Sequence, residues 1–137
     1  MKGFPTFEKK EMEIIKTKNA PAPIGPYNQA VVHENTIYVS GQVALNPETG
    51  EMDNANLADE THRVMRNLGA VLNAAGSDFN HLIKCSIFIL DMNEFKAINE
   101  VYAGFFKDHH PARETVEVSK LPAGARVEVS AIAVRTS

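Results

Sequence analysis

The sequence has a single cysteine, Cys85, among its 137 residues, so it cannot form an intramolecular disulfide. Cys85 lies in the apolar run IKCSIFIL, which favours a buried, unreactive thiol over a catalytic nucleophile. No run approaches the roughly 18 apolar residues that a membrane span needs. The first residues lack the apolar stretch of a secretory signal and are too acidic for a typical mitochondrial presequence. These absences predict a protein of a reducing compartment, most simply the cytoplasm, with no membrane partner.

The sequence also lacks an excess of basic residues. Its 14 Lys and Arg residues are outnumbered by 17 Asp and Glu residues, which leaves a formal net charge of -3. This balance argues against a nucleic-acid partner. No GxxxxGK[ST], GxGxxG or GxSxG motif occurs, and the adjacent His109 and His110 are not spaced like metal ligands. We therefore expect neither a metal site nor a phosphate-binding loop.

The composition that is present is that of an ordinary globular chain. Hydrophobic residues make up 44% and charged residues 23% of the sequence. Its length suits one domain with a single core. We expect residues 1–10 to be a polar N-terminal extension outside the fold and residues 11–137 to form the domain.

Hydrophobic periodicity predicts the order of the elements. Apolar residues spaced by three or four predict a helix from Leu57 that ends at Gly76, and a second helix over 93–107. The inner stripe of the second helix is Phe95, Ile98, Tyr102 and Phe105. Strands are expected at 13–18, twice within 29–42, at 81–90, 115–119 and 126–134. This order predicts an α+β fold with a single sheet of about six strands and two helices on one face.

Both faces of the predicted strands carry apolar side chains. In the strand at 81–90, Cys85, Ile87 and Ile89 alternate with Ser86, Phe88 and Leu90. Two helices can cover only one face, and an exposed apolar face is rare in soluble monomers. The expected cover is another copy of the chain, because most soluble oligomers are homo-oligomers. Sites at subunit boundaries are then plausible.

Two charged residues stand out near the end of the chain. Arg113 follows a proline turn, and its planar guanidinium could grip a carboxylate through two hydrogen bonds; the alternatives are a surface arginine or a structural ion pair. Glu128 interrupts the apolar alternation RVEVSAIAV and could orient or deprotonate water, unless it belongs to a solvated face. A simple hairpin of the last two strands would set Glu117 opposite Glu128, which is unfavourable. Another strand is therefore expected between them.

Three further residues are candidates for ligand contacts. Tyr27 follows Pro26 in a proline-rich loop, and its phenol could donate to a ligand or simply be packed. Asn99 lies on the otherwise apolar stripe of the second helix, where its amide needs a partner in the protein or a ligand. Gly41, in the segment SGQ, could present backbone groups to a ligand or mark a β-bulge.

Several segments together resemble one known family. They are APAPIGPYNQA, IYVSGQ, NPETGE, AAG, DMNEFKAINEVYAGFF and PARETVEVSKLPAGARVEVSAIAV, in this order over about residues 14–135. Each string is modest alone, but jointly they resemble the Rid family, also called YjgF. The resemblance implies a homotrimer of a chorismate-mutase-like fold with three clefts between subunits.

The resemblance also implies a hydrolytic deaminase that needs neither metal nor cofactor. Such an enzyme hydrolyses reactive 2-enamine and 2-imine acids released by pyridoxal-phosphate enzymes, typically 2-aminoacrylate or its tautomer 2-iminopropanoate, to pyruvate and ammonia. By resemblance, Arg113 binds the substrate carboxylate and Glu128 lies near the attacking water. Tyr27 and Asn99 contact the ligand, and the backbone of Thr115 helps to hold water.

One position departs from the family pattern. Glu114 replaces a residue that is usually small, although its backbone N–H still belongs to the substrate-binding set that the resemblance implies. In an extended strand its side chain should point away from that of Arg113. Two other functions are open at this point: a small-molecule-binding regulatory trimer without turnover, and RNA processing or inhibition of translation.

Overall fold

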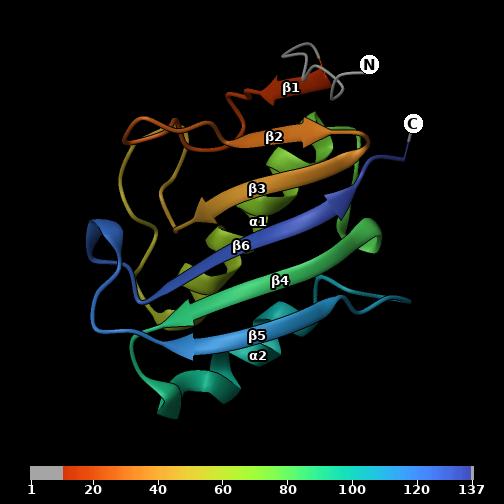
Figure 1. Cartoon of the computed structure of the whole chain (residues 1–137). Coiled ribbons are helices and arrows are strands. Elements are labelled where there is room, and N and C mark those ends of the chain that lie inside the picture. Colours follow the sequence, from red (N-terminus) through yellow and green to blue (C-terminus); the bar gives the residue numbers. More distant parts are fainter. Residues whose placement is uncertain (1–10, 137) are drawn as a thin grey trace, which may run out of the picture.

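The alternating apolar segments form one six-stranded sheet in the computed structural model, which describes residues 11–136 (Figure 1). The strands are β1 (Met12–Ile15), β2 (Ala30–His33), β3 (Thr36–Gln42), β4 (Leu82–Ile89), β5 (Ala112–Glu117) and β6 (Val127–Val134). Their order is β1-β2-β3-β6-β4-β5, and β5 pairs with β4 in parallel while the other neighbours are antiparallel. The predicted α+β sheet is confirmed. The predicted extension at 1–10 lies outside the described residues.

Two helices cover one face of this sheet, as predicted; both lie behind it in Figure 1. The first, α1 (Leu57–Ala74), begins where the Asn56 side chain accepts a hydrogen bond from Asp59 N–H at 2.8 Å. It ends before Gly76, whose φ of 80° supplies the left-handed turn. The second, α2 (Phe95–Ala103), is shorter than the predicted 93–107. Short 3₁₀ turns flank these elements: η2 (Phe79–His81), η3 (Met92–Glu94) and η4 (Pro122–Gly124).

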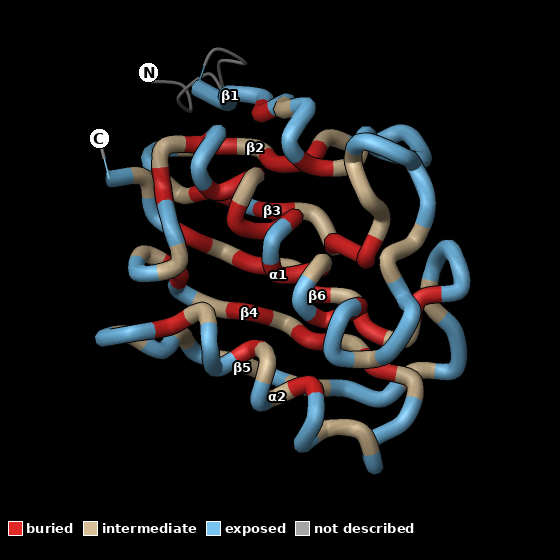
Figure 2. Tube along the Cα trace, turned by 180° about the vertical axis from the view of Figure 1, so that it is seen from behind, coloured by how far each residue is buried: buried red, intermediate tan, exposed pale blue. Residues whose placement is uncertain are grey.

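The hydrophobic core lies between the helices and the covered sheet face. Buried segments run along the central strands β3, β4 and β6 and along α1 in Figure 2. Val64, Leu68 and Leu72 of α1 are fully buried, as their helical spacing predicts. Cys85 is a buried free thiol, as predicted. Among the described residues, no helix is both long and apolar enough to cross a bilayer.

Two strand boundaries differ from the predicted ones. The first strand is Met12–Ile15 rather than 13–18, because the backbone of Thr17 is hydrogen-bonded to the Gln29 side chain instead of to a neighbouring strand. Gln29 Oε1 accepts from Thr17 N–H at 2.7 Å, and Nε2 donates to the Thr17 carbonyl at 3.0 Å. The fifth strand begins at Ala112, three residues earlier than predicted, because it pairs with β4 from Lys84 onward. Arg113 therefore lies inside β5 rather than before it.

The prediction that a strand separates the last two strands is confirmed. That strand is β4, which lies between β5 and β6. As a result Glu128 pairs with Phe88 and not with Glu117. The predicted turn between β2 and β3 is also present, with φ of 51° at Glu34 and 74° at Asn35.

The face of the sheet turned away from the helices is strongly apolar. Ladder pairs connect Ile14, Val31, Tyr38 and Ile132 across four adjacent strands on this open face. Ile14 is 55% exposed and Tyr38 is 50% exposed. The open face thus carries the uncovered apolar surface that the sequence predicts.

Candidate active site

The register of the sheet places Arg113 and Glu128 on opposite faces. Arg113 is the direct neighbour of Cys85 in the β4–β5 ladder, and Glu128 is the direct neighbour of Phe88 in the β4–β6 ladder. Cys85 and Phe88 are three residues apart on one strand, so their side chains point to opposite faces. Arg113 thus points to the helix-covered side and Glu128 to the open side. Within one chain the two side chains do not meet.

Three of the predicted site residues line one cavity. Tyr27, Gly41 and Glu128 surround a space of about 340 Å³, here called the Glu128 cavity. Ile24 and Pro122 contribute an apolar wall. The cavity therefore combines a carboxylate, a phenol and an apolar surface, which suits a small organic ligand.

Gly41 allows the Glu128 carboxylate to lie against β3. The pairing of β3 with β6 shifts register between Val39 and Gln42, so the β-bulge considered from the sequence is present. A Cβ atom built on Gly41 would lie 2.8 Å from Glu128 Cδ, which is too close for any real side chain. Glycine at this position thus keeps open the space that the carboxylate occupies.

The loop that carries Tyr27 is fixed by one buried side chain. Gln29 Nε2 donates to the carbonyls of Ala20 at 3.3 Å and Pro21 at 2.9 Å, in addition to its two bonds with Thr17. Tyr27 is 46% exposed, so the alternative of a packed tyrosine is not supported. Its hydroxyl oxygen accepts a hydrogen bond from Ile24 N–H at 3.3 Å, which leaves the hydroxyl proton for a ligand.

Two fully buried polar residues of α1 hold the walls of the Glu128 cavity. Asn67 Nδ2 donates to the carbonyls of Val43 at 2.9 Å and Leu45 at 2.8 Å. Glu60 accepts from the backbone N–H of Arg126 at 2.7 Å and from its Nε at 2.6 Å. Burying such groups is costly unless they are hydrogen-bonded, as both Glu60 oxygens and the Asn67 amide nitrogen are, while Asn67 Oδ1 has no partner among the described residues. Their bonds fix the chain after β3 and the start of β6, two residues before Glu128.

Glu128 itself carries a poorly solvated carboxyl group. Burial raises its pKa above the ordinary value for glutamate. No donor or cation of residues 11–136 contacts this carboxylate. An unneutralised carboxylate of raised pKa next to a cavity is suited to accept a proton from water.

Arg113 lies in a separate cluster with α2. Its Nη1 donates to Asn99 Oδ1 at 2.6 Å, and its Cζ lies 5.3 Å from the ring centroid of Phe95 and 5.0 Å from that of Tyr102. We call these four residues the Arg113 cluster. No carboxylate of residues 11–136 forms an ion pair with Arg113. The half-buried guanidinium therefore keeps an unneutralised charge, which does not support the structural ion pair considered from the sequence.

Glu114 points away from Arg113, as predicted. It lies on the open face, where it accepts a hydrogen bond from Ser86 Oγ at 2.7 Å and pairs with Lys84 Nζ at 3.3 Å. The Ser86 hydrogen bond and the Lys84 charge lower its pKa. Thr115 shares the face of Arg113, and its hydroxyl is buried with no hydrogen-bond partner among the described residues. Contact of the Glu114 or Thr115 backbone with a substrate remains a prediction.

The roles of several residues around these groups were not predicted from the sequence. Phe95 and Tyr102 were predicted only as core positions on a helical stripe, although they contact the arginine. Glu60 and Asn67 are polar residues on the buried side of α1, and this conflict with its apolar pattern was the available signal. Gln29 follows the proline-rich loop and gave no signal of its own.

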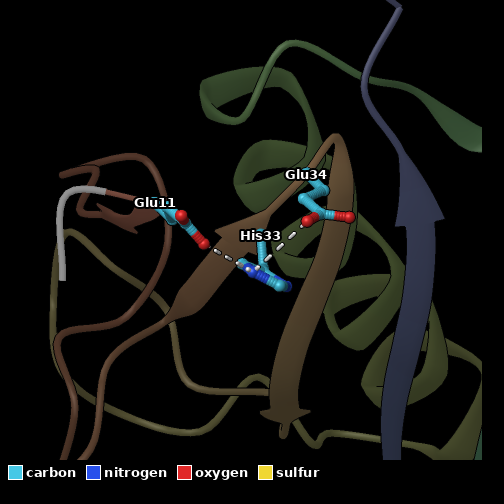
Figure 3. Close-up of side chains that lie close together, drawn as sticks. All are labelled: Glu11, His33 and Glu34. Carbon is cyan, nitrogen blue, oxygen red and sulfur yellow. Dashed lines mark ion pairs between the residues drawn. The ribbon is translucent and has the colours of Figure 1, made fainter. Parts of the chain in front are cut away.

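A further cluster of titratable side chains lies at the β2–β3 turn (Figure 3). His33 Nε2 is 3.6 Å from Glu11 Oε2 and 3.9 Å from Glu34 Oε1. These distances are those of ion pairs that form when His33 is protonated, and the three side chains are half-exposed or exposed. We assign this cluster to surface electrostatics. The expectation that the chain binds no metal stays a prediction.

The chain is similar to known proteins along most of its length. Residues 17–135 match the family model described as Endoribonuclease L-PSP. A Mus musculus protein named 2-iminobutanoate/2-iminopropanoate deaminase is 46% identical over 123 residues, which are 90% of this chain and 91% of that protein. The crystal structure of E. coli TdcF with bound serine is similar with a TM-score of 0.86 and 41% identity, covering 90% of this chain and 99% of that one.

The E. coli YjgF gene product has the same fold. Its crystal structure is similar with a TM-score of 0.85 and 42% identity, covering 90% of this chain and 98% of that one. The predicted fold is thereby confirmed. Sequence identity above 40% along 90% of the chain, together with the matching family model, shows that the chain belongs to the Rid/YjgF/L-PSP family.

Proposed function

We propose that this chain is a hydrolase of 2-imino acids, which converts an imine such as 2-iminopropanoate to the 2-oxo acid and ammonia. The observation that carries the proposal is the Arg113 guanidinium, which is half-buried and has no counter-charge among residues 11–136. A planar cation in this state is matched by a small carboxylate. The mouse relative is named as a deaminase of 2-iminobutanoate and 2-iminopropanoate.

The chemistry requires one water molecule and two protein groups. Arg113 binds the substrate carboxylate and thereby places the adjacent imine carbon. Glu128 accepts a proton from water as the water oxygen adds to that carbon, and this proton passes to the nitrogen, which gives an intermediate with a hydroxyl and an amino group on one carbon. The proton of that hydroxyl then passes to the nitrogen as the C=O bond forms and the C–N bond breaks, so water is consumed, ammonia leaves and no electron is transferred. Tyr27 donates its free hydroxyl proton toward the reacting group.

Positioning supplies much of the rate in this scheme. The imine carbon next to a carboxylate is already electrophilic, and the reaction proceeds in water without a catalyst. An enzyme then gains most by holding the imine and the water at reacting distance. The scheme uses no metal or bound cofactor, and the Glu128 cavity of about 340 Å³ has room for the small substrate and its water.

The opposite orientation of Arg113 and Glu128 supports a site built from two chains. One chain supplies the Arg113 cluster and its neighbour supplies the Glu128 cavity, with the apolar open faces packed against one another. A cyclic arrangement repeats this contact at each boundary. We assign the assembly as a homotrimer with three such sites, and the backbones of Glu114 and Thr115 complete each of them.

The homotrimer leads to a direct prediction of mass. Light scattering is expected to give about three times the chain mass of 15.1 kDa. The trimer should persist at micromolar concentration, because its assembly covers the apolar open face of each chain. A clean monomer under these conditions would contradict both the trimer and the shared site.

The activity is tested by generating the substrate in place. A serine dehydratase releases 2-aminoacrylate from serine, and its decay is followed with and without this chain. Faster decay with equal formation of pyruvate and ammonia is expected. Binding of pyruvate without faster decay would favour a regulatory trimer. RNA incubated in parallel should stay intact, and its cleavage would favour the activity that the family model's description names.

Gly41→Ala is expected to lower kcat/KM by about tenfold or more, because the new methyl group displaces the Glu128 carboxylate from its place against β3. Circular dichroism and light scattering should show an unchanged fold and trimer. The measurement is the steady-state rate on 2-aminoacrylate. Wild-type kinetics in a folded Gly41→Ala trimer would mean that the position of Glu128 does not matter.

We propose the cytoplasm as the location of the protein. The buried free thiol of Cys85 agrees with a reducing environment of this kind.

A further inference from the structure

The residues around Arg113 follow the geometry of one helix. Phe95, Asn99 and Tyr102 are spaced by four and three residues on α2, so their side chains share one face. This face lies under the guanidinium. Arg113 Cζ is 5.3 Å from the ring centroid of Phe95 and 5.0 Å from that of Tyr102, and Asn99 Oδ1 accepts a hydrogen bond from Arg113 Nη1. Both distances are within the range of cation–π interactions.

The two rings stabilise the positive charge without neutralising it. Burial and the neighbouring Cys85 thiol raise the pKa of Tyr102, which outweighs the opposing effect of Arg113. Tyr102 is therefore a neutral phenol at working pH. Asn99 takes one donor of a guanidinium that has five. Donors remain for a carboxylate, and the charge that attracts it is intact.

We propose that Phe95 and Tyr102 form a cation–π support that positions Arg113 for the carboxylate of the substrate. An arginine side chain has many rotamers, and ordering it costs binding free energy when the ligand arrives. The two rings and the Asn99 amide fix the guanidinium in advance. This inference rests on the proposed function for its substrate class, and it assigns Phe95 and Tyr102 as positioning residues rather than catalytic ones.

The carboxylate-binding step can be measured without turnover. Calorimetric titration with pyruvate, the expected product, compares the wild-type trimer with Phe95→Leu and Phe95→Tyr. Phe95→Leu should weaken pyruvate binding by about three- to thirtyfold, the effect of losing a partly desolvated cation–π contact. Phe95→Tyr restores the ring and should bind like the wild type. Recovery by the ring, rather than by any apolar side chain, separates a cation–π role from simple packing.

Phe105→Leu is the matched control. Phe105 is also a half-buried aromatic residue beside α2, but its ring packs against His62 and Phe79 and not against Arg113. Its replacement should leave pyruvate affinity unchanged at a similar cost in stability. Tyr102→Phe, which keeps the ring and removes the hydroxyl, should likewise bind pyruvate within about twofold of the wild type.

Kinetics on 2-aminoacrylate add a second readout. Phe95→Leu should raise KM by the same factor as the pyruvate Kd while kcat changes little, because Glu128 and its water are untouched. Equal pyruvate affinity in folded Phe95→Leu and wild-type trimers would overturn the inference, as would equal losses in Phe95→Leu and Phe105→Leu. A wild type that binds pyruvate but does not hydrolyse 2-aminoacrylate would overturn the proposed function instead, and the binding ratios would still decide the role of the rings.

Discussion

Arg113→Ala is expected to lower kcat/KM for 2-aminoacrylate by about a hundredfold or more. Removing one side of a desolvated, bidentate charge contact typically costs about 2–5 kcal/mol. The guanidinium is half-buried, and its side-chain partners Asn99 and Tyr102 are neutral, so no other cation of the cluster can replace it. Steady-state kinetics with coupled generation of 2-aminoacrylate measures the loss, and light scattering checks that the trimer remains.

Lysine should not restore this function. A lysine at position 113 keeps the charge but lacks the planar pair of donors that matches a carboxylate. Arg66→Ala is the matched control, because Arg66 is an exposed arginine on the outer side of α1. We expect Arg66→Ala to be fully active. Near-normal turnover in Arg113→Ala or Arg113→Lys would return Arg113 to the class of surface arginines.

Glu128→Gln is expected to reduce kcat by about a hundredfold or more and to leave pyruvate affinity nearly unchanged. General-base assistance typically contributes factors of about 10²–10⁴. Glutamine has the same shape but cannot accept a proton from water. Glu48→Gln, at an exposed position in the turn after β3, serves as control. A weaker pyruvate affinity with an unchanged rate would instead make Glu128 a ligand contact.

The pH dependence of the wild type gives a second test of Glu128. The working form is the carboxylate, and burial raises its pKa above the ordinary glutamate value. As the pH falls, Glu128 is therefore protonated earlier than an exposed glutamate, and kcat/KM should decline on the acid side at a correspondingly higher pH. Glu128→Gln should lack this decline. The spontaneous hydrolysis rate is subtracted at each pH, and an identical acid limb in both proteins would assign the titration to another group.

Local patterns in the sequence predicted the elements and the most unusual residues. The helical spacing from Leu57 to Gly76 predicted α1 within two residues of its observed end at Ala74, because burial of one helical face is a local periodic constraint. Arg113 and Glu128 could be singled out because each places a charge where the neighbouring pattern is apolar or extended. Their candidate roles followed from side-chain chemistry alone.

The relation between the two charged residues could not be read from the sequence. It depends on the β4–β5 and β4–β6 registers, which join segments about 28 and 40 residues apart through backbone hydrogen bonds that leave no local pattern. A shift of one residue in either ladder would move Arg113 or Glu128 to the other face. The contacts of Phe95 and Tyr102 with Arg113 depend on the same registers, so the helical stripe alone predicted only core residues.

The central claim is that Arg113 of one chain and Glu128 of a neighbouring chain act in the same site, and mixing the two inactive variants tests it most directly. Equal amounts of Arg113→Ala and Glu128→Gln chains are unfolded together and refolded, with wild type treated identically as control. Random assembly of a cyclic trimer gives each site an intact Arg113 and an intact Glu128 in about one case in four, so about a quarter of the wild-type activity should return. Activity no greater than the mean of the two separate variants, in mixed trimers of confirmed composition, would contradict the shared site.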